Sequence, residues 1–148
     1  MIGVIVTGHG NFATGLTSSV KLIAGSPENY VPVDFTQDKS TDDLERELRE
    51  AIDLLKASCS GILIFTDLVG GSPFKVSAEL SVELKDSVPI AVLSGTNLGM
   101  LVEGNMSRSF MEDLNDLADS LVETGKTQVI HYEFAAPAHE EPEDGDGI

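Results

Sequence analysis

The chain has 148 residues, of which 41% are apolar, and its 25 acidic against 9 basic side chains give a net charge of −16. This length and composition suit one domain with one hydrophobic core, and the charge argues against partners such as nucleic acid or an anionic membrane. The sequence has no apolar run long enough to span a membrane, no signal-peptide pattern in its opening "MIGVIV", and a single cysteine, Cys59, so we expect a cytoplasmic protein.

Short apolar runs alternate with helical patterns along the chain. The apolar runs predict strands at residues 2–8, 30–35, 61–67 and 88–95. The helical patterns predict helices at 12–24, 41–57, 73–84, 96–106 and 110–125. A last run, "TQVIHYEF" at 127–134, predicts a fifth strand. Such alternation is typical of an α/β domain with a largely parallel sheet and helices on both faces.

Two of the predicted helices show their buried faces in the sequence. The first carries apolar residues at helical spacing, namely Phe12, Leu16, Val20 and Ile23. The second carries Leu44, Leu48, Ile52 and Leu55 in the same way. Ser40, with Asp43 three residues on, forms an N-terminal capping signal before the second helix.

The end of the chain differs in composition from the rest. Its last eleven residues, "AHEEPEDGDGI", hold five acids and no lysine or arginine. A segment of this kind has almost nothing to bury. We therefore expect a domain at 1–134 and a disordered acidic tail at 135–148.

Two polar stretches follow the first and third predicted strands: "IVTGHG" at 5–10 and "FTDLVGGSP" at 65–73. In doubly wound sheets the site lies beyond the carboxyl ends of the strands, where the winding direction reverses. If the strand order is 2-1-3-4, these two strands are neighbours, and His9 lies beside Asp67. The carboxylate then accepts an N–H from one ring nitrogen and leaves the other nitrogen as an outward-facing nucleophile.

The loop after the third strand has the pattern of a phosphate-binding site. Gly70 and Gly71 leave backbone N–H groups open at a helix N-terminus, where the helix dipole favours an anion. The hydroxyls of Ser72 and Thr66 are further candidate donors. Taken singly, these features have plainer interpretations: an exposed loop histidine for His9, and a turn with a helix cap for the glycines.

Other kinds of site find less support in the sequence. We expect no metal centre, because His131 falls within a predicted strand and His139 in the tail, where neither joins His9 in a three-ligand cluster. The chain has no Walker A loop. Ser72 lacks the G-x-S-x-G elbow of many hydrolases.

Three motifs together resemble a known family. They are "VTGHG" at 6–10, "DLVGGSPF" at 67–74 and "SGTNLGMLVE" at 94–103. Over about residues 1–130 the chain resembles the IIA component of the mannose class of the bacterial phosphoenolpyruvate:sugar phosphotransferase system (PTS), which serves mannose, fructose, sorbose and N-acetylgalactosamine uptake.

The resemblance implies a cytoplasmic phosphoryl carrier that needs no cofactor. His9 would accept a phosphoryl group from phospho-HPr and pass it to a histidine of EIIB, which phosphorylates the sugar as it enters through the membrane components EIIC and EIID. Asp67 matches the residue that orients the histidine, and Ser72 matches the serine on the phosphate side. Which sugar is transported is not readable, because this component never touches sugar.

The resemblance also implies a homodimer in which the 127–134 strand pairs, antiparallel, with the sheet edge of the other subunit. Gly99 stands where a common family form has proline, so we expect a more mobile loop there; whether this changes EIIB docking is not readable from the sequence. Asn11 and Phe12 differ from other members and form part of a partner-selecting rim. The alternatives are a regulatory module that senses phosphorylation and a small-molecule hydrolase or nucleotide binder on the same fold.

Overall fold

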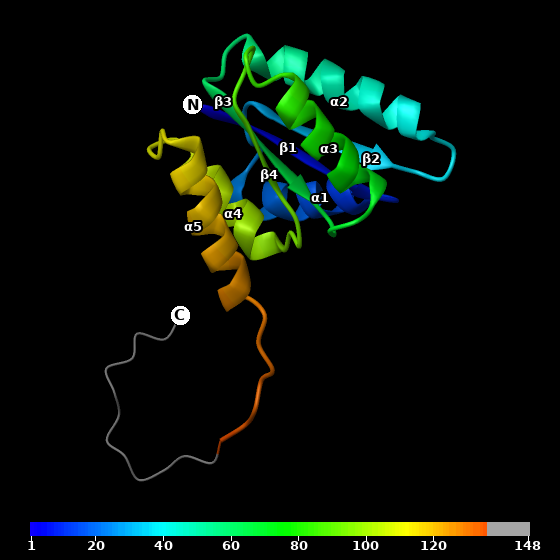
Figure 1. Cartoon of the computed structure of the whole chain (residues 1–148). Helices are drawn as coiled ribbons and strands as arrows, with labels where there is room; N and C mark the ends of the chain where they lie inside the picture. The colour runs from blue at the N-terminus through cyan, green and yellow to red at the C-terminus, as the bar shows by residue number, and fades with distance from the viewer. Residues whose placement is uncertain (136–148) are drawn as a thin grey trace.

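A parallel sheet forms the middle layer of the computed structural model, which describes residues 1–135 (Figure 1). Its strands are β1 (Ile2–His9), β2 (Tyr30–Phe35), β3 (Gly61–Thr66) and β4 (Ile90–Leu93). They are hydrogen-bonded in the order β2-β1-β3-β4, and all neighbouring pairs are parallel. The predicted α/β class and the strand order on which the site prediction depended are therefore confirmed.

Helices cover both faces of this sheet, as expected (Figure 1). One face packs against α1 (Phe12–Ala24), α4 (Leu98–Ser107) and α5 (Leu114–Thr127). The other face packs against α2 (Thr41–Lys56) and α3 (Ser72–Glu83). Among the described residues, no helix is both long and apolar enough to cross a lipid bilayer.

The two hydrophobic clusters follow from the alternation of side chains along the strands. Val4 and Val6 of β1 point into the cluster with α1, α4 and α5, while Ile5 points into the cluster with α2 and α3. The predicted buried face of α2 is confirmed, because Leu44, Leu48, Ile52 and Leu55 are all buried. The predicted buried face of α1 is confirmed only in part, since the side chain of Ile23, in the last turn, is 59% exposed.

Local capping interactions fix where several helices begin. The capping box at α2 is formed: Asp43 N–H donates to Ser40 Oγ, and Ser40 N–H donates to an Asp43 carboxylate oxygen. The helix predicted from residue 110 begins later, at Leu114, because Asp113 caps it by accepting from the backbone N–H of Asp116.

Gly99 lies in the first turn of α4 rather than in a loop, so the expected gain in loop mobility has no basis.

A buried arginine holds the amino end of the sheet together. Arg108, at the end of α4, is only 3% exposed. Its guanidinium donates to the backbone carbonyls of Ile2, Asn29 and Glu28, and to the side chain of Asn105. Burial lowers the pKa of this guanidinium. No charge pattern in the sequence predicted this role, because the acceptors are main-chain groups.

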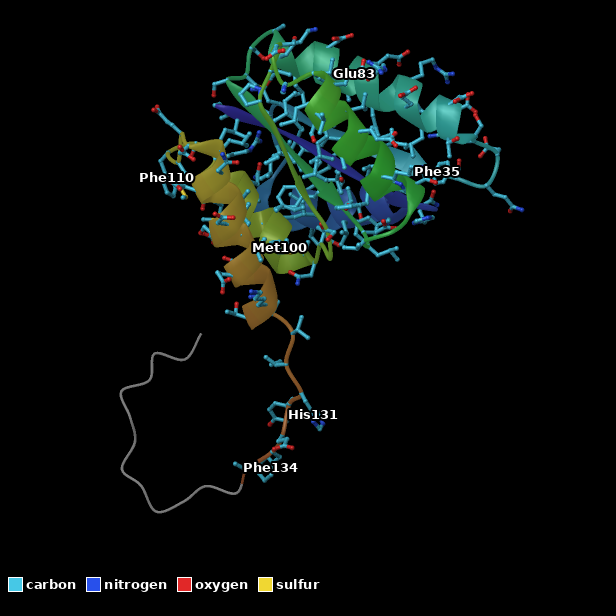
Figure 2. All side chains as sticks on the ribbon, in the orientation of Figure 1. Phe35, Glu83, Met100, Phe110, His131 and Phe134 are labelled. Carbon is cyan, nitrogen blue, oxygen red and sulfur yellow. The ribbon has the colours of Figure 1, made fainter. Side chains whose placement is uncertain are left out.

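The predicted strand at 127–134 is not formed in the single chain. Helix α5 continues to Thr127, and residues 128–135 have no regular secondary structure (Figures 1 and 2). Their apolar side chains are exposed, namely Val129, Ile130, Tyr132 and Phe134. A lone extended segment has no partner for its backbone groups, so it gains nothing from strand geometry. The predicted tail at 135–148 lies outside the described residues except for Ala135, and His139 lies outside them too.

Candidate functional site

His9 and Asp67 meet at the carboxyl edge of the sheet. His9 is the last residue of β1, and Asp67 directly follows β3, whose Thr66 pairs in register with Thr7 of β1. The Nδ1 atom of the imidazole lies 2.6 Å from Asp67 Oδ2, and the backbone N–H of His9 donates to the same oxygen at 2.9 Å. The parallel register therefore places the two groups side by side, at hydrogen-bond distance.

The environment of Asp67 favours its ionised form. Its side chain is 9% exposed. Burial alone raises the pKa of this carboxyl, but hydrogen bonds from the backbone and ring of His9 and from the backbone N–H of Leu68 outweigh burial and lower the pKa below its ordinary value. An ionised carboxylate can only accept hydrogen bonds, so Nδ1 of His9 carries the proton. The other ring nitrogen, Nε2, then has a free lone pair on a side chain that is 48% exposed.

Gly71 forms one wall beside the imidazole. A Cβ atom on this glycine would lie 2.5 Å from His9 Cε1 and 3.2 Å from His9 Nε2, so only glycine allows the backbone to approach the ring so closely. Gly71 also caps α3, and the first intrahelical bond runs from Lys75 N–H to Gly71 O. The earlier N–H groups of this helix lie outside its hydrogen-bond ladder, within the positive end of the helix dipole.

Phe35 also contacts the imidazole. Its ring meets the imidazole edge-on, with ring centroids 5.8 Å apart and planes at 61°. The backbone N–H of Gly10 donates to the Phe35 carbonyl at 2.8 Å, and Gly10 adopts a positive φ of 59°, which glycine tolerates best. The ring of His9 is thus bounded by residues from β2, β3 and the loop before α3.

The remaining predicted residues differ in where the structure places them. Thr66 is wrong as a phosphate donor, because it is fully buried and its hydroxyl donates to the Leu93 carbonyl at 2.7 Å. Ser72 is half-buried at the start of α3 and lines a cavity of about 190 Å³ between α2 and α3. Gly70 has a φ of 95° and open space around its Cβ position. Asn11 and Phe12 lie at the start of α1, next to the site.

The sequence reasoning missed Phe35 and its neighbour Asp34, although both end the strand that pairs with β1. Their place at the carboxyl edge beside His9 was a usable signal once the order 2-1-3-4 was assumed. His131 lies on the exposed segment after α5, well away from Phe35 (Figure 2). Within residues 1–135, no group of three or more His, Cys, Asp or Glu side chains is arranged to hold a metal ion.

Fold and site together define a class of protein, the parallel α/β domains that present a carboxylate-bound imidazole at the switch point of the sheet. A family model described as "PTS system fructose IIA component", EIIA-man, matches residues 3–122. The chain belongs to this EIIA family of the phosphoenolpyruvate:sugar phosphotransferase system, and the resemblance inferred from its motifs is confirmed.

Relatives and solved structures agree with this assignment. The sorbose-specific EIIA component of Lacticaseibacillus casei is 34% identical over 141 residues, covering 88% of this chain and 99% of that protein. The mannose-specific EIIAB component of Escherichia coli K12 is 30% identical over 142 residues, but the chain spans only 43% of its length. The crystal structure of a phosphotransferase system EIIA component from Streptococcus agalactiae has a TM-score of 0.81 and 40% identity, covering 88% of this chain and 97% of that one.

Proposed function

We propose that the protein is a phosphoryl carrier of a PTS sugar-uptake system, with Nε2 of His9 as the atom that holds the phosphoryl group. The observation that carries the proposal is the 2.6 Å contact between His9 Nδ1 and Asp67, which leaves Nε2 free on a half-exposed ring. Membership of the EIIA family supports the same role. A half-exposed ring suits transfer to and from another protein. A site for a small substrate would instead be expected in a buried pocket.

The proposed transfer needs no group beyond the two proteins. The lone pair of His9 Nε2 attacks the phosphorus of a donor phosphohistidine, the new N–P bond forms, and the donor N–P bond breaks with its electron pair returning to the donor ring. His9 keeps its proton on Nδ1, and Asp67 stabilises the positive charge that the ring gains. We propose that backbone N–H groups at the start of α3, with Ser72, Gly70 and Gly71, hold the phosphoryl oxygens. The carrier then passes the group on by the same step in reverse.

The surface beside His9 suits a docking protein. Leu68 and Val69 directly follow Asp67, and both side chains are exposed. A partner that covers them buries apolar surface and excludes water from the reacting atoms. We propose HPr as the donor and EIIB as the acceptor, with EIIC and EIID served indirectly, and this role places the chain in the cytoplasm.

The proposal is tested by phosphorylation in vitro. The protein is incubated with phosphoenolpyruvate, enzyme I and HPr, and its intact mass is measured before and after acid treatment. We expect one added phosphoryl group that acid removes, no label on His9→Ala, and full label on the matched control His131→Ala. Label on His9→Ala at the wild-type level refutes the assignment.

We also propose that the protein is a homodimer in which residues 127–134 add, antiparallel, to the free edge of β4 in the other subunit. Support comes from the exposed apolar side chains of this segment and from the position of β4 at the end of the sheet. Ile130→Asp places a charge in the exchanged strand but changes only an exposed residue in the single chain. Light scattering should give the mass of a dimer for the wild type and of a monomer for this variant, and a monomeric wild type contradicts the proposal.

A further inference from the structure

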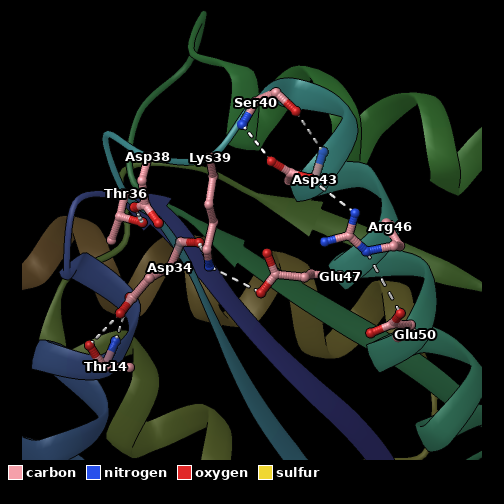
Figure 3. Close-up of polar contacts among 10 residues, drawn as sticks. All are labelled: Thr14, Asp34, Thr36, Asp38, Lys39, Ser40, Asp43, Arg46, Glu47 and Glu50. Carbon is pink, nitrogen blue, oxygen red and sulfur yellow. Dashed lines mark hydrogen bonds and ion pairs between the residues drawn. The ribbon is translucent and has the colours of Figure 1, made fainter.

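The N-terminus of α1 is capped from another element of the fold. Asn11 occupies the cap position but makes no side-chain hydrogen bond there. Instead Asp34, in β2, accepts from the backbone N–H of Thr14 at 2.9 Å and from its hydroxyl at 2.6 Å (Figure 3). Both carboxylate oxygens are therefore used to hold the first turn of the helix that follows His9.

Asp34 is itself held in place by the segment that follows β2. Its backbone carbonyl accepts from Lys39 Nζ at 2.8 Å, and the same ammonium group pairs with Glu47 of α2 at 3.0 Å (Figure 3). Phe35, the next residue, accepts the N–H of Gly10 and sets its ring against the imidazole. The end of β2 thus holds Gly10 and Thr14, which follow His9 along the chain, and places the Phe35 ring against the imidazole.

We propose that Asp34 and Phe35 are positioning residues for phosphoryl transfer, because together they fix the direction in which His9 Nε2 points. Asp67 holds only one edge of the ring, at Nδ1, and this single bond leaves the ring free to swing about the Nδ1–Oδ2 contact. The Phe35 ring, whose centroid lies 5.8 Å from that of the imidazole, limits that swing. Asp34 keeps the 10–14 segment, and with it the backbone of His9, in one arrangement. The rate measurement that tests this inference rests on the proposed function, whereas the NMR measurement does not.

The first test separates positioning from partner binding. Asp34→Ala removes both bonds to Thr14, and Phe35→Leu keeps an apolar side chain but removes the ring edge. Asp38→Ala is the matched control, because it removes a carboxylate from the turn just after β2 but breaks only a side-chain bond with the hydroxyl of Thr36. With phospho-HPr as donor, we expect kcat to fall about 10-fold to 100-fold in the first two variants with KM within about twofold of wild type. The control should match the wild type in both.

The second test reads the imidazole without any transfer. Nitrogen-15 and proton NMR spectra of histidine-labelled protein report the tautomer and surroundings of the His9 ring. We expect shifted or broadened ring signals in Asp34→Ala and Phe35→Leu, unchanged signals in Asp38→Ala, and wild-type amide dispersion outside the site in all three. The proposal is overturned if the ring signals of Asp34→Ala and Phe35→Leu are identical to those of the wild type. It is also overturned if the kcat of these two variants is no lower than that of Asp38→Ala. A wild type that takes no label from phospho-HPr refutes the carrier role, and the NMR comparison then decides the positioning of His9 alone.

Discussion

Gly71→Ala is the sharpest perturbation of the site that the structure allows. The added Cβ would lie 2.5 Å from His9 Cε1, whereas ordinary contacts begin near 3.4 Å, so the ring has to move by about 0.9 Å. A displacement of that size strains the 2.6 Å bond to Asp67 and turns Nε2 away from its position. Misplacement of a reacting group by about 1 Å costs roughly 100-fold in rate, and we expect a loss of this order in phosphoryl transfer from phospho-HPr.

The same substitution should hardly affect folding. Gly71 has a φ of −90°, which alanine adopts without strain, and the half-exposed imidazole can move toward solvent. We therefore expect a change below about 1 kcal/mol in the free energy of unfolding. Gly25→Ala, at the C-terminal end of α1 and outside the site, is the matched control with the opposite outcome. Its φ of 79° penalises alanine by about 1–2 kcal/mol, but its Cβ would meet no atom within 4 Å, so its transfer rate should change little.

Quench-flow measurement of His9 labelling gives the two rates, and urea denaturation gives the two stabilities. The expected result is a crossed pattern: Gly71→Ala transfers slowly but is stable, and Gly25→Ala transfers at the wild-type rate but is destabilised. Wild-type transfer by Gly71→Ala would refute the reasoning, because the ring would then tolerate the displacement that the added Cβ imposes. Slower transfer by Gly25→Ala than by Gly71→Ala would refute it as well.

Three further substitutions test separate parts of the structure. Asp67→Asn should slow labelling by about 10²–10⁴-fold. Because the pKa of Asp67 in the folded protein lies below 3.8, the ionised carboxylate stabilises the fold above that pH. The unfolding free energies of wild type and variant, measured with urea at a series of pH values, should therefore converge as the pH falls through the folded-state pKa. Arg108→Met should lose on the order of 3 kcal/mol of unfolding free energy, since three carbonyls lose a charged donor. Arg46→Met, which breaks only exposed ion pairs, should leave the unfolding free energy close to that of the wild type. Ser40→Ala should cost about 1 kcal/mol in thermal denaturation by breaking the capping box, and an unchanged melting temperature would contradict that.

The sequence predicted the pairing of His9 with Asp67 because parallel strands bring their carboxyl ends to one edge. It did not predict the contact of the ring with Gly71 or Phe35, since these depend on the rotamer of a half-exposed side chain. Thr66 was assigned to the site from its place next to Asp67, but the hydroxyl instead donates to a carbonyl of β4. Proximity along the chain therefore did not decide the direction of that side chain.

The C-terminal end was the hardest part of the fold to predict. "TQVIHYEF" has the alternation of a strand, and the single chain nevertheless leaves residues 128–135 irregular. Strand propensity reflects packing against neighbours, and these residues lack neighbours within the chain. The helix ends shifted for a related reason: Asp113, a cap residue, decides where α5 begins, and the apolar pattern that starts at Phe110 does not.

A single carboxylate oxygen, Oδ2 of Asp67, binds both the main chain and the ring of His9. If the ring carries a phosphoryl group on Nε2, neither of these bonds has to break, and no proton has to leave Nδ1. The empty and loaded forms then share one geometry, so loading and unloading face similar barriers. A carrier of this kind is intrinsically reversible. The direction of transfer is set by the concentrations of phosphorylated donor and unphosphorylated acceptor rather than by the carrier itself.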